Sequence, residues 1–236
     1  MLTLDRLTLA QGAFRLTADL GLATGSRTAV MGPSGGGKST LLSAIAGFLA
    51  PVSGRILWNG QDITGLPPAD RPVAILFQDN NLFPHLTIAQ NAGLALAPRL
   101  RPTPADAARI EEALSRVGLA GMGARKPAEL SGGQQSRAAL ARLLLSDRPI
   151  VLMDEPFAAL GPGLRADMLD LATATLGTAG RTILLVTHDP DDALRLGGDL
   201  VLVADGSVSP PAPAARLLAD PPPALRAYLG PSAGPP

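Results

Sequence analysis

Apolar residues follow two different patterns along this chain. From residue 14 to residue 22 apolar and polar side chains alternate, which is typical of a strand that is buried on one face. Elsewhere the apolar residues run together in short segments that end on polar groups, as in strands that are covered on both faces. These continuous segments lie at residues 28–31, 73–77, 149–153 and 182–186.

Predicted helices lie between the apolar segments. After the first segment, apolar side chains recur with the period of a helix, and a further helix is expected at about residues 163–176. Alternating strands and helices predict an α/β fold with a mostly parallel sheet, whose functional groups lie at the carboxyl ends of the strands. A strand at residues 56–58 is expected to enter a hairpin turn at Asn59 and Gly60. The first predicted helix carries Leu41, Ile45, Phe48 and Leu49.

The middle and the end of the chain differ from the strand-rich parts. Between about residue 80 and residue 146 the pattern is mainly helical, and Thr103 followed by Pro104 is a typical helix start. We therefore expect a helical subdomain at about 80–146, inserted into a single domain of residues 1–236. The last segment, at about 210–236, contains nine prolines and is expected to be a helix-containing tail with poorly ordered ends.

The composition limits which partners the chain can have. It contains 20 basic and 20 acidic residues, so it lacks the strongly basic surface that is typical of nucleic-acid-binding proteins. It has no cysteine, and hence no disulfide and no thiolate metal site. No apolar segment approaches the length needed to span a bilayer, and the N-terminus lacks the apolar core of a signal peptide. We therefore expect a soluble, cytoplasmic chain without a nucleic-acid partner, which would act at a membrane only through another protein.

A glycine-rich segment lies between the first continuous strand and the helix that follows it. It fits the pattern G-x-x-x-x-G-K-[ST], in which small residues let backbone N–H groups converge on phosphate oxygens at a helix N-terminus. Lys38 is expected to reach the terminal phosphates, and the Ser39 hydroxyl is placed to ligate Mg²⁺. The nucleotide-binding residues predicted here are Gly32, Pro33, Ser34, Gly35, Gly36, Gly37, Lys38, Ser39 and Thr40.

Polar groups also follow the other continuous strands. Gln78 follows the second segment, and His188 lies shortly after the fourth. Asp154 and Glu155 follow the third, where Asp154 is the carboxylate expected to support Mg²⁺ and Glu155 is suited to activate a water molecule as a base. Because the carboxyl ends of parallel strands meet at one edge of a sheet, we expect a single nucleotide site built from several strand ends.

A second phosphate-binding helix start is predicted at Ser131. Its side chain can cap the helix that follows, and the two glycines after it expose N–H groups at the helix N-terminus. One nucleotide site does not need two such helix starts from one chain. A head-to-tail homodimer explains both, since each ATP then lies between the glycine-rich loop of one subunit and the Ser131 turn of the other. The residues of this turn are Ser131, Gly132, Gly133 and Gln134.

Together, these motifs resemble those of the ATP-binding subunits of ABC transporters, over essentially the whole chain. The resemblance implies a P-loop NTPase fold with an ABC ATPase core, in which an antiparallel β subdomain and an inserted helical subdomain accompany the mostly parallel sheet. It also implies ATP and Mg²⁺ as cofactors, transmembrane permease subunits as partners, and a peripheral place at the cytoplasmic face of the inner membrane. A periplasmic substrate-binding protein would act indirectly, through the permease.

The resemblance also implies a role for each motif. Glu155 corresponds to the catalytic base, and His188 to the switch histidine that contacts the γ-phosphate. Gln78 corresponds to the Q-loop glutamine, which contacts Mg²⁺ and water and senses the permease. The Walker A motif, the signature motif and the Walker B strand correspond to residues 32–39, 130–134 and 150–154.

A closer resemblance lies in residues 71–87 and 89–94, which are similar to the ATP-binding subunits of thiamine importers. Those subunits carry a similar Asn-Asn-Leu-Phe stretch after the Q-loop glutamine, here at residues 80–83. The resemblance implies import of thiamine and its phosphate esters, with His85 facing the membrane partner. Importers of polyamines, iron or amino acids, and ABC ATPases outside transport, are the alternatives.

Three positions depart from the family pattern. Gly161 stands where the family has an aspartate, at the end of the segment 158–161 after the catalytic glutamate. Gln11 stands where an aromatic residue usually stacks on adenine, which leaves Phe14 as a candidate substitute. After the signature motif, Gln-Ser at residues 135–136 replaces the more usual Arg-Gln.

Overall fold

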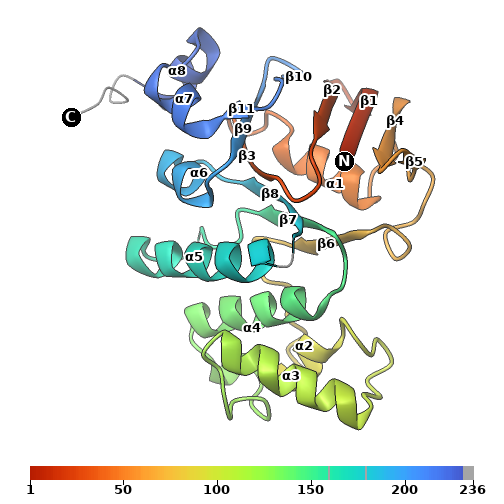
Figure 1. The fold of residues 1–236 in the computed structure, drawn as a ribbon, viewed down its shortest axis with the longest axis vertical. Coiled ribbons are helices and arrows are strands. Elements are labelled where there is room, and N and C mark those ends of the chain that lie inside the picture. Colours follow the sequence, from red (N-terminus) through yellow and green to blue (C-terminus); the bar gives the residue numbers. More distant parts are fainter. Residues whose placement is uncertain (159, 179, 231–236) are drawn as a thin grey trace.

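Parallel strands form the middle of the molecule, and helices lie against them (Figure 1). The computed structural model describes residues 1–158, 160–178 and 180–230. Within these ranges the strands join in one sheet in the order β5-β4-β1-β2-β10-β9-β3-β8-β7-β6, with β11 paired to β9. Two parts of the sequence predictions, Ala159 and the end of the proline-rich tail at 231–236, lie outside the described residues.

The described residues confirm the predicted alternation of strands and helices. The strands are β1 (Leu2–Gln11), β2 (Phe14–Leu22), β3 (Arg27–Met31), β4 (Ser53–Trp58), β5 (Gln61–Asp62), β6 (Val73–Leu76), β7 (Ile150–Asp154), β8 (Thr182–Val186), β9 (Asp199–Ala204), β10 (Ser207–Val208) and β11 (Ala212–Pro213). The helices are α1 (Lys38–Ala46), α2 (Ile88–Gly93), α3 (Pro104–Arg116), the 3₁₀ helix η1 (Pro127–Glu129), α4 (Gly132–Leu145), α5 (Pro162–Thr178), α6 (Pro190–Leu196), α7 (Ala214–Ala219) and α8 (Pro223–Leu229).

The central strands are continuously apolar because both faces of the sheet are covered. Along β3, Ala29 and Met31 belong to one hydrophobic core, which includes residues of α4 and α5. Val30 between them belongs to a second core, which includes residues of α1. The strands β9, β3, β8, β7 and β6 are parallel neighbours, so the loops after β3, β6, β7 and β8 leave the same edge of the sheet.

An antiparallel part extends the sheet on the other side. β1 pairs with β2 and with β4, and β4 pairs with β5 across the predicted hairpin turn. In that turn Asn59 and Gly60 both have positive φ angles, 49° and 82°, as a tight hairpin requires. The alternating strand predicted at residues 14–22 is confirmed, because every second residue of β2 from Leu16 onward is buried.

The helices α2, α3 and α4 pack together at one end of the molecule, away from the antiparallel strands (Figure 1). Each begins at a side-chain cap. Thr87, Thr103 and Ser131 accept a hydrogen bond from the backbone N–H three residues later, and the side chain at that later position bonds back. The helix start predicted at Thr103 and Pro104 is confirmed. The stretch from residue 88 to residue 145 thus contains helices and no strand among its described elements.

Two predictions about apolar residues were wrong. α1 ends at Ala46 because Gly47 adopts a φ of 90°, and Phe48 beyond it is exposed instead of lying on a buried helix face. The ring of Phe48 lies against that of Phe77, with 6.0 Å between the centroids. β6 is not covered on both faces: it ends the sheet at one side, and most of its residues are only half-buried.

The proline-rich tail forms two short helices, α7 and α8, over its described part. Leu225 of α8 is fully buried, and Tyr228 packs against the same hydrophobic core as the larger helices. The tail is therefore part of the fold up to Gly230. None of the helices in the described ranges has the length and apolar character needed to cross a membrane.

Candidate nucleotide site

The glycine-rich loop after β3 has a backbone that requires glycine at two positions. Gly32 has a φ of 147°, and a Cβ atom there would lie 2.0 Å from the carbonyl oxygen of Val203 on β9. Gly37 has a φ of 103°, and a Cβ atom there would lie 2.5 Å from Cζ of Phe14. The loop can therefore pack directly on the sheet and lead into the N-terminus of α1, where free N–H groups can bind an anion.

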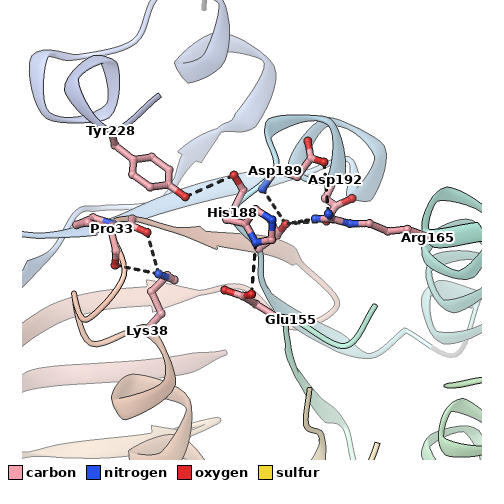
Figure 2. A network of polar contacts seen from close by, with 10 residues as sticks. Pro33, Lys38, Glu155, Arg165, His188, Asp189, Asp192 and Tyr228 are labelled. Atoms are coloured by element: carbon pink, nitrogen blue, oxygen red, sulfur yellow. Dashed lines mark hydrogen bonds and ion pairs between the residues drawn. The ribbon is translucent and has the colours of Figure 1, made fainter. Parts of the chain in front are cut away.

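Lys38 begins α1, and its side chain folds back into the loop (Figure 2). Its Nζ atom donates hydrogen bonds to the carbonyl oxygens of Gly32 and Pro33, at 2.8 and 3.0 Å. The buried ammonium group thus contacts neutral oxygens, and a phosphate in the loop would supply an opposite charge. The remaining predicted residues of the loop are exposed or half-buried, except for the buried Gly37: Ser34, Gly35, Gly36, Ser39 and Thr40.

Asp154 ends β7 near the start of α1. Burial raises the pKa of its carboxyl group above the ordinary value of 3.8, and the negative charge of Glu155 acts in the same direction. The neighbouring Ser39 hydroxyl and the charge of Lys38 lower this pKa. A neighbouring carboxylate and hydroxyl are oxygen ligands that suit Mg²⁺, so this pair fits the predicted metal. Across the described ranges, no cluster of three or more His, Cys, Asp or Glu forms a separate metal centre.

Glu155 and His188 follow neighbouring strands, and their side chains touch. Nδ1 of His188 lies 3.3 Å from Oε2 of Glu155 (Figure 2). Glu155 has a φ of 45°, which turns the chain sharply after β7, and strained backbone of this kind is frequent at functional sites. The two side chains are 25% and 54% exposed, so water can reach both. A carboxylate here can accept a proton from water while the imidazole contacts it.

An ion-pair network holds the loop that carries His188. Arg165 of α5 pairs with Asp192 of α6, and its guanidinium lies 3.5 Å from the carboxylate of Asp189. The Thr187 hydroxyl donates to Asp192 at 2.6 Å and accepts a hydrogen bond from Arg165 at 3.1 Å. The backbone N–H of Asp189 also donates to Thr187, at 3.1 Å. Because Thr187 and Asp189 flank His188, the chain is held on both sides of the histidine.

Gln78 follows β6 and is exposed. The loop after it contains two consecutive left-handed residues, Asn80 and Asn81, with φ angles of 57° and 46°. Arg142 of α4 donates hydrogen bonds to both of their carbonyl oxygens, each at 2.8 Å. The helix that starts at the Ser131 turn therefore holds the loop that follows Gln78, which links the two predicted motifs.

The Ser131 turn has the predicted geometry. Ser131 Oγ accepts a hydrogen bond from the Gln134 N–H at 3.3 Å, and the Gln134 side-chain oxygen accepts one from the Ser131 N–H at 3.0 Å. Ser131 and Gly132 are exposed, and Gly133 is half-buried. Within the part of the chain that the structure describes, no hydrogen bond joins this turn to the glycine-rich loop. One chain alone therefore does not bring the two predicted phosphate-binding helix starts into contact.

Phe14, the candidate substitute for an adenine-stacking residue, lies beside the glycine-rich loop. Its ring edge faces Gly37, and it packs against the hydrophobic core that contains α1. Gln11 pairs with Phe14 across the hairpin of β1 and β2 and is exposed. Packing on the loop and the core accounts for the position of the Phe14 ring without a bound base.

Three residues near the site were not predicted from the sequence: Arg165, Asp192 and Tyr228. Arg165 and Asp192 belong to no local motif. They lie on two different helices and pair only in the folded chain, so no local pattern reveals them. Tyr228 contacts the backbone of the loop after β8. The sequence does contain a pattern that indicates a packed position for this residue. Leu225, Tyr228 and Leu229 recur at helical spacing, which indicates a packed helix within the proline-rich tail.

Known proteins resemble this chain over nearly its whole length. The model of the family described as ABC transporter matches residues 17–158. The thiamine import ATP-binding protein ThiQ of Cereibacter sphaeroides is 62% identical over 231 residues, which cover 98% of this chain and 100% of that protein. The protein of the same name from Ruegeria sp. is 55% identical over 230 residues, with 98% and 100% covered.

Solved structures show the same fold. A dimeric post-hydrolysis structure of the ATP-binding cassette MJ0796, bound to ADP and Pi, has a TM-score of 0.77 and 30% identity, over 91% of this chain and 99% of that one. A second dimeric structure, of MJ0796 as a bacterial ABC transporter cassette, has a TM-score of 0.78. The predicted α/β fold is thus that of an ABC ATPase cassette. With its glycine-rich loop, its strand-end carboxylates and these relatives, the chain belongs to the ABC transporter family, as an ATP-binding subunit that hydrolyses ATP.

Proposed function

We propose that this chain hydrolyses ATP at the cytoplasmic face of the inner membrane to power an importer of thiamine and its phosphate esters. The observation that carries the substrate is the 62% and 55% identity, over nearly the whole chain, to proteins named for thiamine import. The Asn-Asn-Leu-Phe stretch at residues 80–83 supports the same substrate. In this proposal residues 1–236 act as one ATP-binding domain, with a helical subdomain at about 80–146 and a tail at about 210–236.

The nucleotide chemistry uses groups at the carboxyl edge of the parallel strands. The loop at residues 32–40 would receive the phosphates of ATP, and Lys38 would exchange its two carbonyl partners for phosphate oxygens. Glu155 would accept a proton from the attacking water as it adds to the γ-phosphate. His188, which already contacts Glu155, would hydrogen-bond to that phosphate and keep it aligned.

Mg²⁺ is the second cofactor of this proposal. Ser39 and Asp154 would hold it, together with Gln78 from the loop after β6. The burial that raises the pKa of Asp154 favours a bound cation, because a cation compensates a carboxylate that has lost water. When bound, the ion neutralises charge on the phosphate oxygens.

A homodimer would complete the site. The exposed turn at residues 131–134 presents free N–H groups at the start of α4, but it does not meet the phosphate-binding loop of its own chain. Two chains arranged head to tail would place each turn against the nucleotide of the other subunit. Both solved structures of MJ0796 named above are dimeric, which supports this arrangement.

The permease would bind beside the loop that follows Gln78. A groove of about 290 Å³ lies there, lined by residues that include Phe83, Leu94 and Arg142. Phe83 is exposed, and its ring lies edge-on to that of His85 at 6.0 Å. An exposed aromatic ring beside an apolar groove suits a helix of a membrane protein that inserts its own apolar side chains. The periplasmic binding protein would act only through the permease.

The substrate is tested with the assembled transporter in proteoliposomes. Binding protein loaded with thiamine or thiamine pyrophosphate should stimulate ATP hydrolysis and drive uptake of labelled thiamine. Stimulation by a binding protein loaded with a polyamine, iron or an amino acid, and none by thiamine, would contradict the substrate while leaving the ATPase assignment in place. Glu155→Gln serves as the control, because it should abolish both hydrolysis and uptake.

A further inference from the structure

The single tyrosine of the chain lies over the candidate nucleotide site. Tyr228 belongs to α8, and its hydroxyl donates a hydrogen bond of 3.4 Å to the backbone carbonyl oxygen of His188 (Figure 2). α8 is anchored by the fully buried Leu225 and by the Tyr228 ring, which packs against the same core. A residue from the end of the fold thus contacts the loop whose histidine touches the predicted base.

Charged groups of the site surround the Tyr228 hydroxyl and affect its pKa. Burial raises its pKa above the ordinary value of 10.0, and the negative charges of Glu155 and Asp189 act in the same direction. The backbone of Gly32 lowers this pKa. The hydroxyl therefore remains protonated at neutral pH and able to donate to the His188 carbonyl oxygen.

The network of Arg165 and Asp192 contacts the His188 loop from α5 and α6. That network reaches the residues on either side of His188, through the Thr187 hydroxyl and the Asp189 carboxylate. Tyr228 approaches the same loop from the opposite side, from above the glycine-rich loop (Figure 2). Since the histidine side chain itself is largely exposed, its direction depends on how firmly its backbone is held.

We propose that Tyr228 is a positioning residue for ATP hydrolysis, whose hydroxyl holds the backbone of His188 and so keeps the imidazole aligned on the γ-phosphate. The inference rests on the proposed roles of Glu155 and His188. The hydroxyl acts on a backbone atom beside the reacting groups. Its loss should therefore slow the chemical step more than it weakens ATP binding.

The test replaces Tyr228 by phenylalanine in the full-length chain, assembled with its permease. Tyr228→Phe removes the hydroxyl and keeps the ring in the core. kcat for ATP should fall about three- to tenfold, while KM changes by less than about twofold. The matched control is Arg226→Gln on the same helix, which breaks only an exposed ion pair with Asp220 and should leave both constants unchanged. Thermal unfolding curves of both variants should match that of the parent, which separates lost alignment from lost folding.

A double-mutant cycle distinguishes positioning from packing. In single-turnover reactions, Tyr228→Phe should change the rate by less than about twofold once His188→Ala has removed the imidazole, because both changes act through one group. Three outcomes would each overturn the proposal. Tyr228→Phe could slow the reaction equally with and without the His188 imidazole, it could keep the parental kcat, or Arg226→Gln could lower kcat by as much as Tyr228→Phe. If Glu155→Gln and His188→Ala kept the parental rate, the proposed chemistry would fail and the role of Tyr228 with it. If only Tyr228→Phe kept that rate, the proposed chemistry would stand without Tyr228.

Discussion

The imidazole of His188 and the carboxylate of Glu155 are in contact, with 3.3 Å between Nδ1 and Oε2. The contact follows from strand register. Asp154 at the end of β7 pairs with Val186 at the end of β8, so the residues that follow these two strands emerge side by side. The sheet itself therefore places the pair, and substitutions of either side chain should change the chemistry with little effect on the fold.

Glu155→Gln should keep ATP binding and lose nearly all turnover. The amide has the size of the carboxylate but does not accept a proton from water, so the rate should fall by about 10²- to 10⁴-fold. The ATP-bound dimer should then accumulate and elute early in size-exclusion chromatography with Mg-ATP. Hydrolysis at the parental rate would show that another residue is the base.

Mixing two inactive variants tests whether the site is shared between subunits. Lys38→Ala should inactivate a homodimer by removing the phosphate contact in the glycine-rich loop. Ser131→Arg should inactivate it by blocking the turn that faces the nucleotide of the other subunit. In a mixed dimer one site carries both lesions and the other carries neither, so part of the ATPase activity should return. Steady-state hydrolysis at varied mixing ratios measures the recovery. Absence of recovery at every ratio would argue against a shared site.

Asp154 should destabilise the nucleotide-free protein at neutral pH. Its folded-state pKa lies above the ordinary value of 3.8, so the folded protein holds this proton more tightly than the unfolded chain. The associated stability is present below pH 3.8 and is lost as pH rises through the folded-state pKa. Asp154→Asn should thus raise the thermal midpoint at pH 7, and the gain should shrink as pH falls toward 4.

The matched control for this prediction is Asp147→Asn, which removes an exposed carboxylate that lies 3.4 Å from Arg109. Its thermal midpoint should follow that of the parent at each pH. A lower midpoint for Asp154→Asn at pH 7, without nucleotide, would contradict the prediction. With Mg-ATP present the parent should have the higher thermal midpoint and Asp154→Asn the lower one, because the Asp154 carboxylate helps to bind the ion.

Gly161→Asp tests the departure from the family pattern. The backbone of Gly161 does not need glycine: its φ is not left-handed, and a Cβ atom there would meet nothing within 4 Å. The residue precedes α5, and its carbonyl oxygen accepts the Arg165 N–H at 2.9 Å, so an aspartate could also cap the helix. We expect faster or more cooperative ATP hydrolysis in the assembled transporter. An unchanged rate and an unchanged Hill coefficient would show that the missing carboxylate has no effect.

Arg71 should be important for stability although it is remote from the nucleotide. Its side chain is 1% exposed and donates hydrogen bonds to four backbone carbonyl oxygens, two of them near the end of α1. Arg71→Met leaves these oxygens without a donor, which should cost about 3 kcal/mol and lower the thermal midpoint by about 6–12 °C. Arg55→Met, which removes an exposed partner of Asp5, is the control and should change the midpoint little. Equal shifts for the two variants would contradict the role of Arg71.

The strand β1 was not predicted from the sequence, and a bulge is the physical reason. β1 is rich in leucine, but its spacing changes at Arg6, where φ is 46° and the register with β2 shifts. This bulge breaks the two-residue period by which a half-buried strand is recognised. In contrast, β2 has no such break and was predicted from end to end. The edge position of β6 depends on which strands pair, and no local pattern contains that information. The buried leucines of β1 are Leu2, Leu4, Leu7 and Leu9.

The local geometry of the motifs could be predicted because each motif spans only a few neighbouring residues. A few neighbouring residues determine the geometry of a glycine-rich turn before a helix, or of a carboxylate after an apolar strand. The side chains that hold these motifs could not be predicted in the same way. Arg142 binds backbone carbonyls 61 and 62 residues away, and Tyr228 binds one 40 residues away. Such contacts exist only once the fold has formed.

The pairing of β3 determines when the glycine-rich loop can form during synthesis. β3 lies between β8 and β9, and Gly32 packs on the backbone of Val203. The strand that leads into the loop therefore emerges from the ribosome long before either of its neighbours. At about 5–20 residues per second, roughly 10 to 30 s pass before β9 is available. During that interval β3 lacks a neighbour on the β9 side, so the packing of Gly32 on Val203 forms only after β9 has been made.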